Sequence, residues 1–324
     1  MRAPDFWQTD NPLARFLEPF GQIAGSITAR RALRPPSVRA GMPVICVGNL
    51  TTGGTGKTPV VSSIVRRLQT RGKTPAVITR GYGGQLKGPV RVDPRIHTFE
   101  AVGDEALLHA RNGATWVSRD RSKAAGPAVA DGADVLVMDD GHQHASLAKD
   151  LSLIVIDGRT GFGNGRLFPA GPLREPIRSG LARAQAAVVM GEDRLGLAVE
   201  LSRVLPVLRA HFVPGPERAR LAGERVVAFA GIGDPEKFYH SLVEVGARVS
   251  AFHPFDDHYA FDVTDIQPIL DEAYSIGAVP VTTEKDAVRL APDQRQQVNV
   301  LSADVAWEKP AELDTFLDRL WTRS

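Results

Sequence analysis

The sequence predicts an α/β fold in which helices cover both faces of a parallel sheet. Short apolar runs rich in β-branched residues recur along the chain, and they are apolar at every position rather than at alternate ones. Helical patterns separate several of these runs. Strands that are buried on both faces and alternate with helices are typical of parallel sheets. The predicted strands are residues 44–47, 76–79, 135–138, 153–156 and 186–189.

Two helical patterns lie between these strands. In the first, apolar residues recur at helical spacing from Val60 to Leu68, and Gly72 follows at a position suited to a helix C-cap. The second covers residues 103–112. Both fit the crossover connections that join neighbouring parallel strands.

A second, smaller α/β series follows a connection rich in proline and arginine at residues 213–218. Its predicted elements are strands at residues 226–231, 247–252 and 279–283 and a closing helix at residues 310–321. A chain of 324 residues is longer than one hydrophobic core usually serves. We therefore expect one domain at residues 1–220 and a smaller C-terminal α/β domain at residues 221–324.

The composition fits a soluble α/β protein, with 43% hydrophobic and 23% charged residues. Lys and Arg number 39 against 37 Asp and Glu, a balance that does not favour nucleic-acid binding. No run approaches the roughly 20 apolar residues of a membrane-spanning helix, and the start lacks the apolar core of a signal peptide. The lone cysteine, Cys46, is interpreted as a small buried side chain and is typical of a reducing compartment, so we expect a cytosolic protein.

The strongest motif directly follows the first predicted strand and contains three glycines before Lys57 and Thr58. Glycines between a strand and a helix let backbone N–H groups point at phosphate, which is typical of a phosphate-binding loop, or P-loop. Lys57 is expected to contact the β- and γ-phosphates of ATP, and the Thr58 hydroxyl to hold Mg²⁺. The predicted nucleotide-binding residues are Thr51, Thr52, Gly53, Gly54, Thr55, Gly56, Lys57 and Thr58. The first domain is thus predicted to be a P-loop NTPase-like parallel sheet domain.

One position departs from the common P-loop pattern, which has glycine where this chain has Thr51. A glycine-rich turn that binds nothing is the alternative interpretation. The run Gly56-Lys57-Thr58 directly after a strand favours nucleotide binding.

A second motif lies at the end of the strand predicted at residues 135–138, where Asp139 and Asp140 follow. The carboxyl ends of strands in open α/β sheets face the ligand crevice. Two carboxylates beside a triphosphate favour a bound cation, so both are predicted to serve Mg²⁺. His142 and His144 come next, but a zinc site is disfavoured because no Cys or further His has suitable spacing. We interpret both histidines as residues that shape the loop through hydrogen bonds.

The loop alone leaves several classes of nucleotide-binding protein open. Partitioning and positioning ATPases of the membrane carry an additional lysine where this chain has Thr52. GTPases carry a guanine-reading Asn-Lys-x-Asp, for which residues 283–286 have the wrong spacing. A nucleotide-dependent membrane switch remains the alternative to a phosphotransferase.

Eight further motifs occur in an order that resembles the tetraacyldisaccharide 4'-kinase family over most of the chain. They are Thr-Arg-Gly-Tyr-Gly-Gly at 79–84, Val-Gly-Asp-Glu at 102–105, the segment 139–144, Gly-Asn-Gly at 163–165, Pro-Ala-Gly-Pro-Leu-Arg-Glu at 169–175, Ala-Gly-Ile-Gly-Asp-Pro at 230–235, Asp-His at 257–258 and Thr-Glu-Lys-Asp at 283–286. The family's loop also has a hydroxyl residue at the position of Thr51. A family histidine that follows His258 is replaced here by Tyr259.

The resemblance implies a two-domain α/β fold whose C-terminal domain closes an ATP cleft. It also implies transfer of the ATP γ-phosphate to the 4'-hydroxyl of an acylated glucosamine disaccharide 1-phosphate, a lipid A precursor. By the same resemblance, Asp104 is the catalytic carboxylate, His258 its partner, and Arg174 a neighbour of the transferred phosphate. A positioned base and an arginine suit this chemistry, because a sugar hydroxyl is a poor nucleophile and a phosphoryl group is anionic.

Bland interpretations of these residues stay open. Asp104 is also suited to capping the helix that it opens, and His258 to a turn. Arg80 and Tyr82 either shape a glycine-rich loop or contact the lipid.

The N-terminal region predicts an amphipathic helix that Asn11 caps and Pro12 begins, with Pro19 as a kink. Its apolar stripe comprises Leu13, Phe16, Leu17, Phe20, Ala24 and Ile27, and the basic residues that follow are Arg30, Arg31, Arg34 and Arg39. Such a helix suits an anionic membrane surface, although packing on its own domain is the alternative. With an acylated acceptor, we expect a peripheral, monotopic protein on the cytoplasmic face of the inner membrane, with no obligate protein partner.

Overall fold

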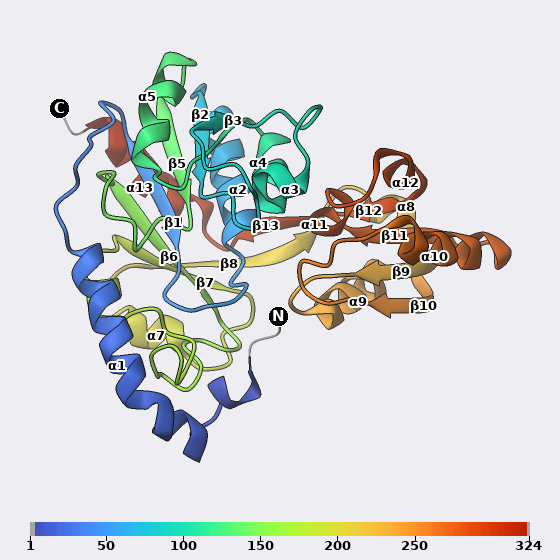
Figure 1. Cartoon of the computed structure of the whole chain (residues 1–324), viewed down its shortest axis with the longest axis horizontal. Helices are drawn as coiled ribbons and strands as arrows, with labels where there is room; N and C mark the ends of the chain where they lie inside the picture. Colours follow the sequence, from blue (N-terminus) through green and yellow to red (C-terminus); the bar gives the residue numbers. More distant parts are fainter. Residues whose placement is uncertain (1–3, 323–324) are drawn as a thin grey trace.

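The computed structural model describes residues 4–322 and contains two sheets (Figure 1). The large sheet has nine strands in the order β13-β8-β7-β6-β1-β5-β2-β4-β3, and the small sheet has four in the order β10-β9-β11-β12. Neighbouring strands of the large sheet are parallel except for the antiparallel pairs β3–β4 and β13–β8 at its edges. The predicted α/β fold with a second, smaller sheet is confirmed. Residues 1–3, which are part of the segment tested for a signal peptide, lie outside the described residues.

Eight strands follow the predicted apolar runs closely, whereas the strands at residues 90–91, 114–117, 207–214, 299–301 and 303–307 were not predicted. The large sheet comprises β1 (Val44–Gly48), β2 (Pro75–Thr79), β3 (Val90–Arg91), β4 (Ala114–Val117), β5 (Val135–Asp139), β6 (Leu151–Asp157), β7 (Ala186–Met190), β8 (Val207–Pro214) and β13 (Ala303–Trp307). The small sheet comprises β9 (Arg225–Ala230), β10 (Arg248–Pro254), β11 (Val279–Thr283) and β12 (Asn299–Leu301).

Helices cover both faces of the large sheet and flank the small one. Those of the large-sheet part are α1 (Pro12–Ala32), α2 (Lys57–Gln69), α3 (Phe99–Val102), α4 (Asp104–Ala110), α5 (Ser122–Ala130), α6 (Ile177–Leu181), α7 (Leu197–Leu201) and α13 (Pro310–Thr322), with the short 3-10 helix η1 (Asp5–Trp7) before α1. Those of the small-sheet part are α8 (Arg218–Leu221), α9 (Pro235–Glu244), α10 (Val263–Ser275), α11 (Glu284–Ala287) and α12 (Pro292–Gln297).

Alternate residues of each central strand face opposite layers of the core, as the pleat of a strand requires. In β1, Ile45 packs in the cluster formed with α2, whereas Val44 and Cys46 pack in the cluster formed with α5. All five residues of β1 are buried. This double burial explains why the strand is apolar throughout, and Cys46 is a buried free thiol, as interpreted from the sequence.

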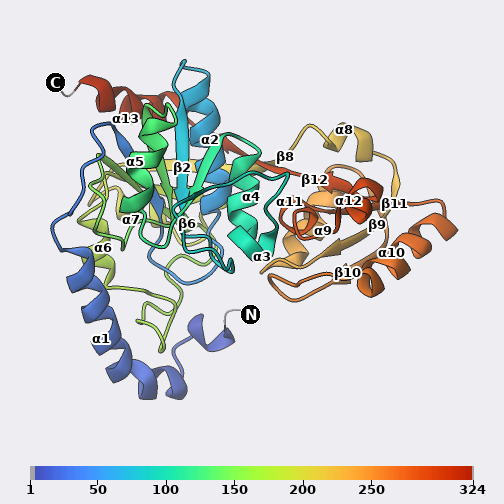
Figure 2. The ribbon, with the colours of Figure 1, turned by 45° about the horizontal axis from the view of Figure 1, so that its top comes forward.

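The closing strand and helix return to the large sheet, which differs from the predicted division at residue 220. Strand β13 pairs antiparallel with β8, and Leu313 and Leu317 of α13 pack in the same core as α2. Figure 1 labels both strands between the two sheets, and Figure 2 shows β8 leading from the large sheet towards the small one. The helix was predicted correctly but assigned to the wrong sheet, because apolar periodicity shows that a helix has a buried face and not which sheet covers it.

Ion pairs also join the small-sheet part to the carboxyl end of β6. Lys237 of α9 lies 3.0 Å from Asp157, the last residue of β6. Arg159 lies 3.3 Å from Asp234, which precedes α9. The Ala-Gly-Ile-Gly-Asp-Pro segment of the small-sheet part is thereby held near the end of the large sheet from which ligands are usually bound.

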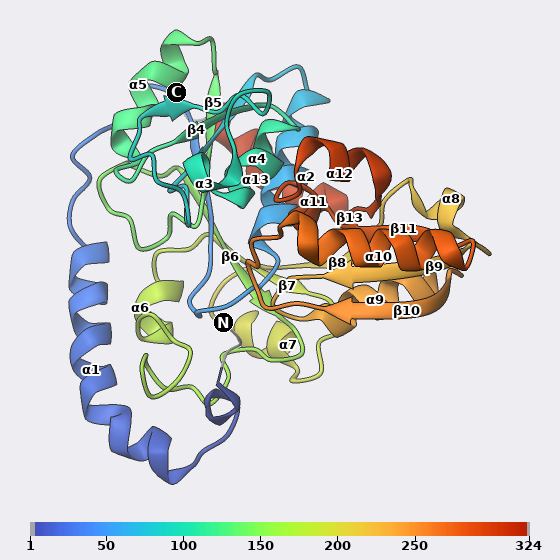
Figure 3. The same ribbon diagram turned by 45° about the vertical axis from the view of Figure 1, so that its right-hand side comes forward.

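Helix α1 runs along the outside of the large-sheet part (Figure 3). Its first turn is capped by Asn11, whose Oδ1 accepts a hydrogen bond from the Ala14 N–H. The buried face carries small residues, and a Cβ atom on Gly21 or Gly25 would come within 2.7 Å of Leu167. Within residues 4–322, no helix combines the length and apolar character needed to cross a membrane.

Candidate active site

The glycine-rich loop connects β1 to α2 as the sequence predicts. Gly53 and Gly56 have backbone φ angles of +119° and +87°, values that residues with a Cβ atom rarely adopt. Gly56 is also the N-cap of α2, so the positive end of the helix dipole lies at the loop. The Asn49 side chain donates a hydrogen bond to the Thr55 hydroxyl across the loop, at 3.3 Å.

The backbone at Thr51, where the chain departs from the P-loop pattern, pairs with a distant segment. Thr51 forms a backbone bridge with Leu173, and the Thr52 N–H donates to the Pro172 carbonyl at 2.7 Å. The Arg174 N–H in turn donates to the Leu50 carbonyl at 2.8 Å. The Pro-Ala-Gly-Pro-Leu-Arg-Glu segment therefore pairs with the loop and brings Arg174 to Asp140, the carboxylate that Lys57 also approaches.

Asp140 accepts charge-assisted contacts from two predicted site residues. Arg174 Nη1 lies 2.9 and 3.0 Å from the two carboxylate oxygens, and Lys57 Nζ lies 3.6 Å from Oδ1. Burial opposes ionisation of this carboxyl, but Lys57 and Arg174 hold its pKa well below the ordinary value. Lys57, Asp140 and Arg174 thus form one charged cluster beside the loop.

Asp139 ends β5 and is more deeply buried than Asp140. Its Oδ2 lies 2.8 Å from Nε2 of His109, a fully buried residue of α4, while its Oδ1 is buried and has no hydrogen-bond partner within the described chain. An unpartnered buried carboxylate oxygen is costly unless a ligand satisfies it. Among residues 4–322, no three His, Cys, Asp or Glu side chains cluster as a metal centre.

Asp104 lies in the large-sheet part and His258 in the small-sheet part, and the two side chains share one hydrogen bond. His258 Nδ1 lies 2.9 Å from Asp104 Oδ2, although the residues are 154 positions apart. Burial alone would raise the pKa of Asp104, but the hydrogen bond with His258 and the charges of Lys285 and Arg289 lower it to about 2. Asp104 is therefore an ionised carboxylate at neutral pH.

Asp104 begins α4 but does not cap it, because Gly103 holds the N-cap position. The Asp104 Oδ1 still accepts the Glu105 N–H at 2.8 Å, so part of the capping interpretation holds. The turn interpretation of His258 also holds, since His258 lies within the turn that the Tyr259 N–H closes by donating to the Asp256 carbonyl at 3.1 Å. Both residues thus combine a local backbone contact with the contact between sheets.

Backbone strain is concentrated at these two clusters. Among residues 4–322, the non-glycine residues with positive φ are Asp140, at +51°, and His258, at +59°. Such conformations are uncommon outside glycine and are frequent at functional sites. The pKa of Glu105, the neighbour of Asp104, is raised by burial and by the charge of Asp139, and the charges of Lys285 and Lys57 oppose this rise.

Several site neighbours were not singled out from the sequence as site residues. Lys285 Nζ lies 3.1 Å from His258 Nε2, and the buried Arg289 contacts Asp104. Lys285 belongs to the Thr-Glu-Lys-Asp motif, so the sequence did point to its segment. Arg289 and His109 lie outside every quoted motif. Periodicity identifies the buried positions of a helix but not the long-range partner of a buried charge.

Of the two loop histidines, His142 makes the expected side-chain hydrogen bond, whereas the buried Nε2 of His144 has no hydrogen-bond partner within the described residues. The buried His142 Nε2 lies 2.9 Å from the Gly180 carbonyl, and burial lowers its pKa to about 4, which is consistent with a structural role. The exposed Tyr82 ring lies 5.8 Å from the His258 ring. Tyr82 therefore contacts the Asp104–His258 pair as well as shaping its own loop.

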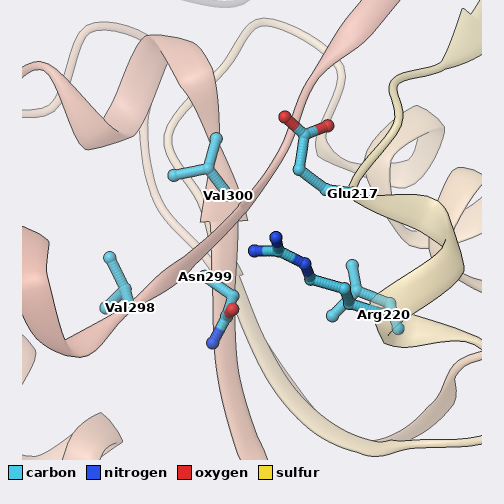
Figure 4. Close-up of a pocket in the computed structure, with 6 residues that line it drawn as sticks. Glu217, Arg220, Val298, Asn299 and Val300 are labelled. Atoms are coloured by element: carbon cyan, nitrogen blue, oxygen red, sulfur yellow. The ribbon is translucent and has the colours of Figure 1, made fainter.

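A small pocket lies away from these residues, between α8 and the start of β12 (Figure 4). Its volume is about 160 Å³, and the Arg220 side chain extends across it towards the strand. Glu217 at its rim accepts a hydrogen bond from the Ser302 hydroxyl at 2.7 Å. The pocket contains no predicted site residue, so the loop at the end of β1 remains the candidate active site.

A P-loop with a strand-terminal carboxylate, a cation cluster and an Asp–His pair defines a phosphotransferase of the P-loop class. The chain belongs to the tetraacyldisaccharide-1-P 4'-kinase (LpxK) family, whose model matches residues 13–322. The kinase class and the family inferred from the sequence are thereby confirmed.

Relatives and a solved structure agree over the whole chain. A tetraacyldisaccharide 4'-kinase of Rhodospirillum rubrum is 56% identical, covering 99% of this chain and 98% of the relative. One of Paramagnetospirillum magneticum is 53% identical and covers all of both chains. The crystal structure of LpxK from Aquifex aeolicus in complex with ATP matches with a TM-score of 0.74 at 26% identity, covering 95% of this chain and 99% of that chain.

Proposed function

We propose that this protein transfers the γ-phosphoryl group of ATP to the 4'-hydroxyl of a tetraacyldisaccharide 1-phosphate, a step of lipid A biosynthesis. The main observation in support is the contact of 2.9 Å between Asp104 of α4 and His258 of the loop after β10, in a chain that also carries a P-loop. Family membership supports the same acceptor. The product is the 1,4'-bisphosphorylated disaccharide.

The loop and its cations bind the triphosphate. Amides of the Gly53–Thr58 turn are proposed to bind the phosphates, and the N-terminus of α2 adds favourable dipole charge. Lys57 and Arg174 already neutralise Asp140, so an incoming phosphate competes with that carboxylate for both cations. Arg174 suits the transferring group because its guanidinium is always charged and offers two parallel donors.

The oxygen atoms available at the end of β5 and the start of α2 fit Mg²⁺. Asp139 Oδ1 is buried and unpartnered, and the Thr58 hydroxyl stands directly after Lys57. Asp140 is held by Lys57 and Arg174, so Asp139 is the better candidate for direct coordination. Held by Asp139 and Thr58, Mg²⁺ would supply positive charge that offsets the negative charge of the triphosphate.

The Asp104–His258 pair prepares the acceptor hydroxyl. As the bond between the 4'-oxygen and the γ-phosphorus forms, the bond from that phosphorus to the bridging oxygen of ADP breaks and the pair accepts the hydroxyl proton. A carboxylate with a pKa of about 2 is a weak base alone, and the neighbouring imidazole helps it to accept the hydroxyl proton. The small-sheet part, which supplies His258, is proposed to close the ATP cleft.

Helix α1 is proposed to seat the protein on the cytoplasmic face of the inner membrane. Its buried face packs on Leu167, which agrees with the alternative interpretation of an internal helix. Its opposite side leaves large apolar side chains in solvent, namely Leu13, Phe16, Phe20, Ile23 and Ile27. Arg30 and Arg31 in the last turn suit anionic headgroups. The helix thus serves both roles.

Purified protein with ATP, Mg²⁺ and tetraacyldisaccharide 1-phosphate tests the proposal. We expect release of ADP that depends on the acceptor and formation of one new phosphate monoester at the 4'-position, detected by mass spectrometry. If the rate of ADP release does not depend on the lipid but is increased by a protein partner, the result would instead support a nucleotide-dependent membrane switch.

A further inference from the structure

Arg289 is the most enclosed cation at the contact between the two sheets. It is 3% exposed and lies shortly after α11, in the small-sheet part. Removing a guanidinium from water is unfavourable unless its donors are satisfied. Burial of this residue therefore calls for a specific set of partners.

The partners of Arg289 come from both parts of the molecule. Nε and Nη2 lie 3.2 and 3.1 Å from Oδ2 of Asp104, on α4 of the large-sheet part. Nη1 donates to the carbonyl of Gly231 at 3.0 Å and of Tyr259 at 3.3 Å, and lies 3.2 Å from Asp286 Oδ1. One side chain thus links Asp104 to three segments around the small sheet.

These contacts surround His258 on two sides. Tyr259 is its neighbour in sequence, and Gly231 accepts a hydrogen bond from the His258 N–H as well as from Arg289. Asp286 accepts the Gly231 N–H at 3.0 Å and so completes the frame. Arg289 therefore holds the carboxylate and the loop that presents the imidazole with one rigid, planar group.

We propose that Arg289 is a positioning residue for the phosphoryl transfer: it aligns Asp104 with His258 and makes that alignment depend on docking of the small sheet against α4. Arg289 does not contact the P-loop cluster of Lys57, Asp140 and Arg174 in the described structure. The inference rests on the proposed function only for the identity of the reaction that is impaired.

The charges that face Asp104 determine how its titration responds to loss of Arg289. Glu105 faces it from α4, His258 and Asp257 from the loop after β10, Lys285 and Asp286 from α11, and Arg289 from the segment behind α11. Arg289 is one of the cations that lower the Asp104 pKa. Its removal raises that pKa, so the acid limb of kcat moves to higher pH.

The variants Arg289→Met and Arg289→Lys distinguish the effect of losing the planar hydrogen-bond geometry of Arg289 from the effect of losing its charge. The methionine keeps apolar bulk and removes every donor, whereas the lysine keeps the charge and loses the planar fork. We expect kcat of Arg289→Met to fall on the order of 100-fold, because small misplacements of reacting groups have effects of this size. The KM for MgATP should change little, and Arg289→Lys should retain the acid limb of the parent with an intermediate kcat.

Arg295→Met is the matched control. Arg295 is a partly buried cation of the neighbouring α12 that donates to the carbonyls of Val288 and Leu290 but does not contact Asp104. It should lose stability without a shift of the acid limb. A folded Arg289→Met protein with the kcat and acid limb of its parent would overturn the proposal. If that variant does not fold, a folded Arg289→Lys protein with unchanged kcat has the same meaning.

A second readout needs no catalysis. Ring ¹⁵N shifts of His258, assigned by comparison with His258→Gln, report whether Nδ1 stays hydrogen-bonded to Asp104. Arg289→Met should change these shifts and Arg295→Met should not. If the His258 shifts are unchanged in Arg289→Met, the positioning role is refuted, even if the parent protein phosphorylates another acceptor. If the shifts change in Arg289→Met but the parent protein has no kinase activity, only the proposed function is contradicted.

Discussion

The nucleotide side and the acceptor side of the candidate site are built in different ways. Lys57, Asp140 and Arg174 all belong to the large-sheet part, and backbone hydrogen bonds between the P-loop and residues 172–174 hold them together. The Asp104–His258 pair takes one residue from α4 and the other from the loop after β10. The first cluster needs one sheet to be folded, and the second also needs two sheets to be docked.

This difference teaches that nucleotide binding and acceptor activation can be separated. The P-loop cluster contains its own charge balance, because two cations surround one carboxylate. The pair depends on Arg289 and Lys285, which lie in the small-sheet part. Changes at the contact between sheets should therefore affect turnover more than ATP affinity.

Asp104→Ala is expected to have the largest effect that separates the two clusters. Loss of the carboxylate removes the partner of His258, so turnover should fall about 10²- to 10⁴-fold. Affinity for ATP, measured by isothermal titration calorimetry, should stay within a few-fold of the parent. Unchanged turnover would remove Asp104 from the reaction.

Lys57→Ala tests the nucleotide side, where binding and catalysis are expected to change together. The variant lacks the ammonium group that contacts Asp140 and the proposed phosphate position, so kcat should fall about 10²- to 10³-fold. The dissociation constant of MgATP should rise as well. A variant that still phosphorylates the lipid at the rate of the parent would contradict the P-loop assignment.

Acid unfolding measures how strongly the acceptor side joins the two parts. The pKa of Asp104 is about 2 against an ordinary 3.8, which corresponds to about 2 kcal/mol of stability. Because the folded pKa is the lower one, this stability is present above about pH 4 and is lost as the pH falls towards 2. The free energies of unfolding of the parent and of Asp104→Asn, measured with urea, should therefore converge as the pH falls over that window. A difference between them that stays constant with pH would count against the ionic contact.

The smallest effect is expected on the solvent-exposed outer face of α1. Replacing Phe16 and Phe20 with Gln removes apolar side chains that are 71% and 58% exposed, so binding to anionic phospholipid vesicles should weaken roughly tenfold or more. The matched control is Val199→Gln, an exposed apolar position on α7. Equal vesicle binding by all three proteins would exclude this face as the membrane contact.

Much of the architecture could be predicted from local sequence. The strand bounds, the P-loop at residues 51–58 and the carboxylates at the end of β5 follow from patterns that adjacent residues carry together. Thr51 departs from the common P-loop pattern, and the resemblance to the family accounted for that departure, whereas the backbone bridge between Thr51 and Leu173 appeared only in the structure. The resemblance named Asp104 and His258 as a pair, which local patterns could not do.

The amino-acid sequence by itself determined which segments become buried strands, where a phosphate-binding turn forms and which helix has an unusually apolar outer face. Burial periodicity and glycine backbone freedom are local properties, so they can be read from neighbouring residues. Only the tertiary structure decided that α13 returns to the large sheet, that His109 meets Asp139 and that Arg289 joins Asp104 to the small sheet. Those outcomes depend on how distant segments pack, because a buried charge is stabilised by whichever partner the fold brings within hydrogen-bond distance.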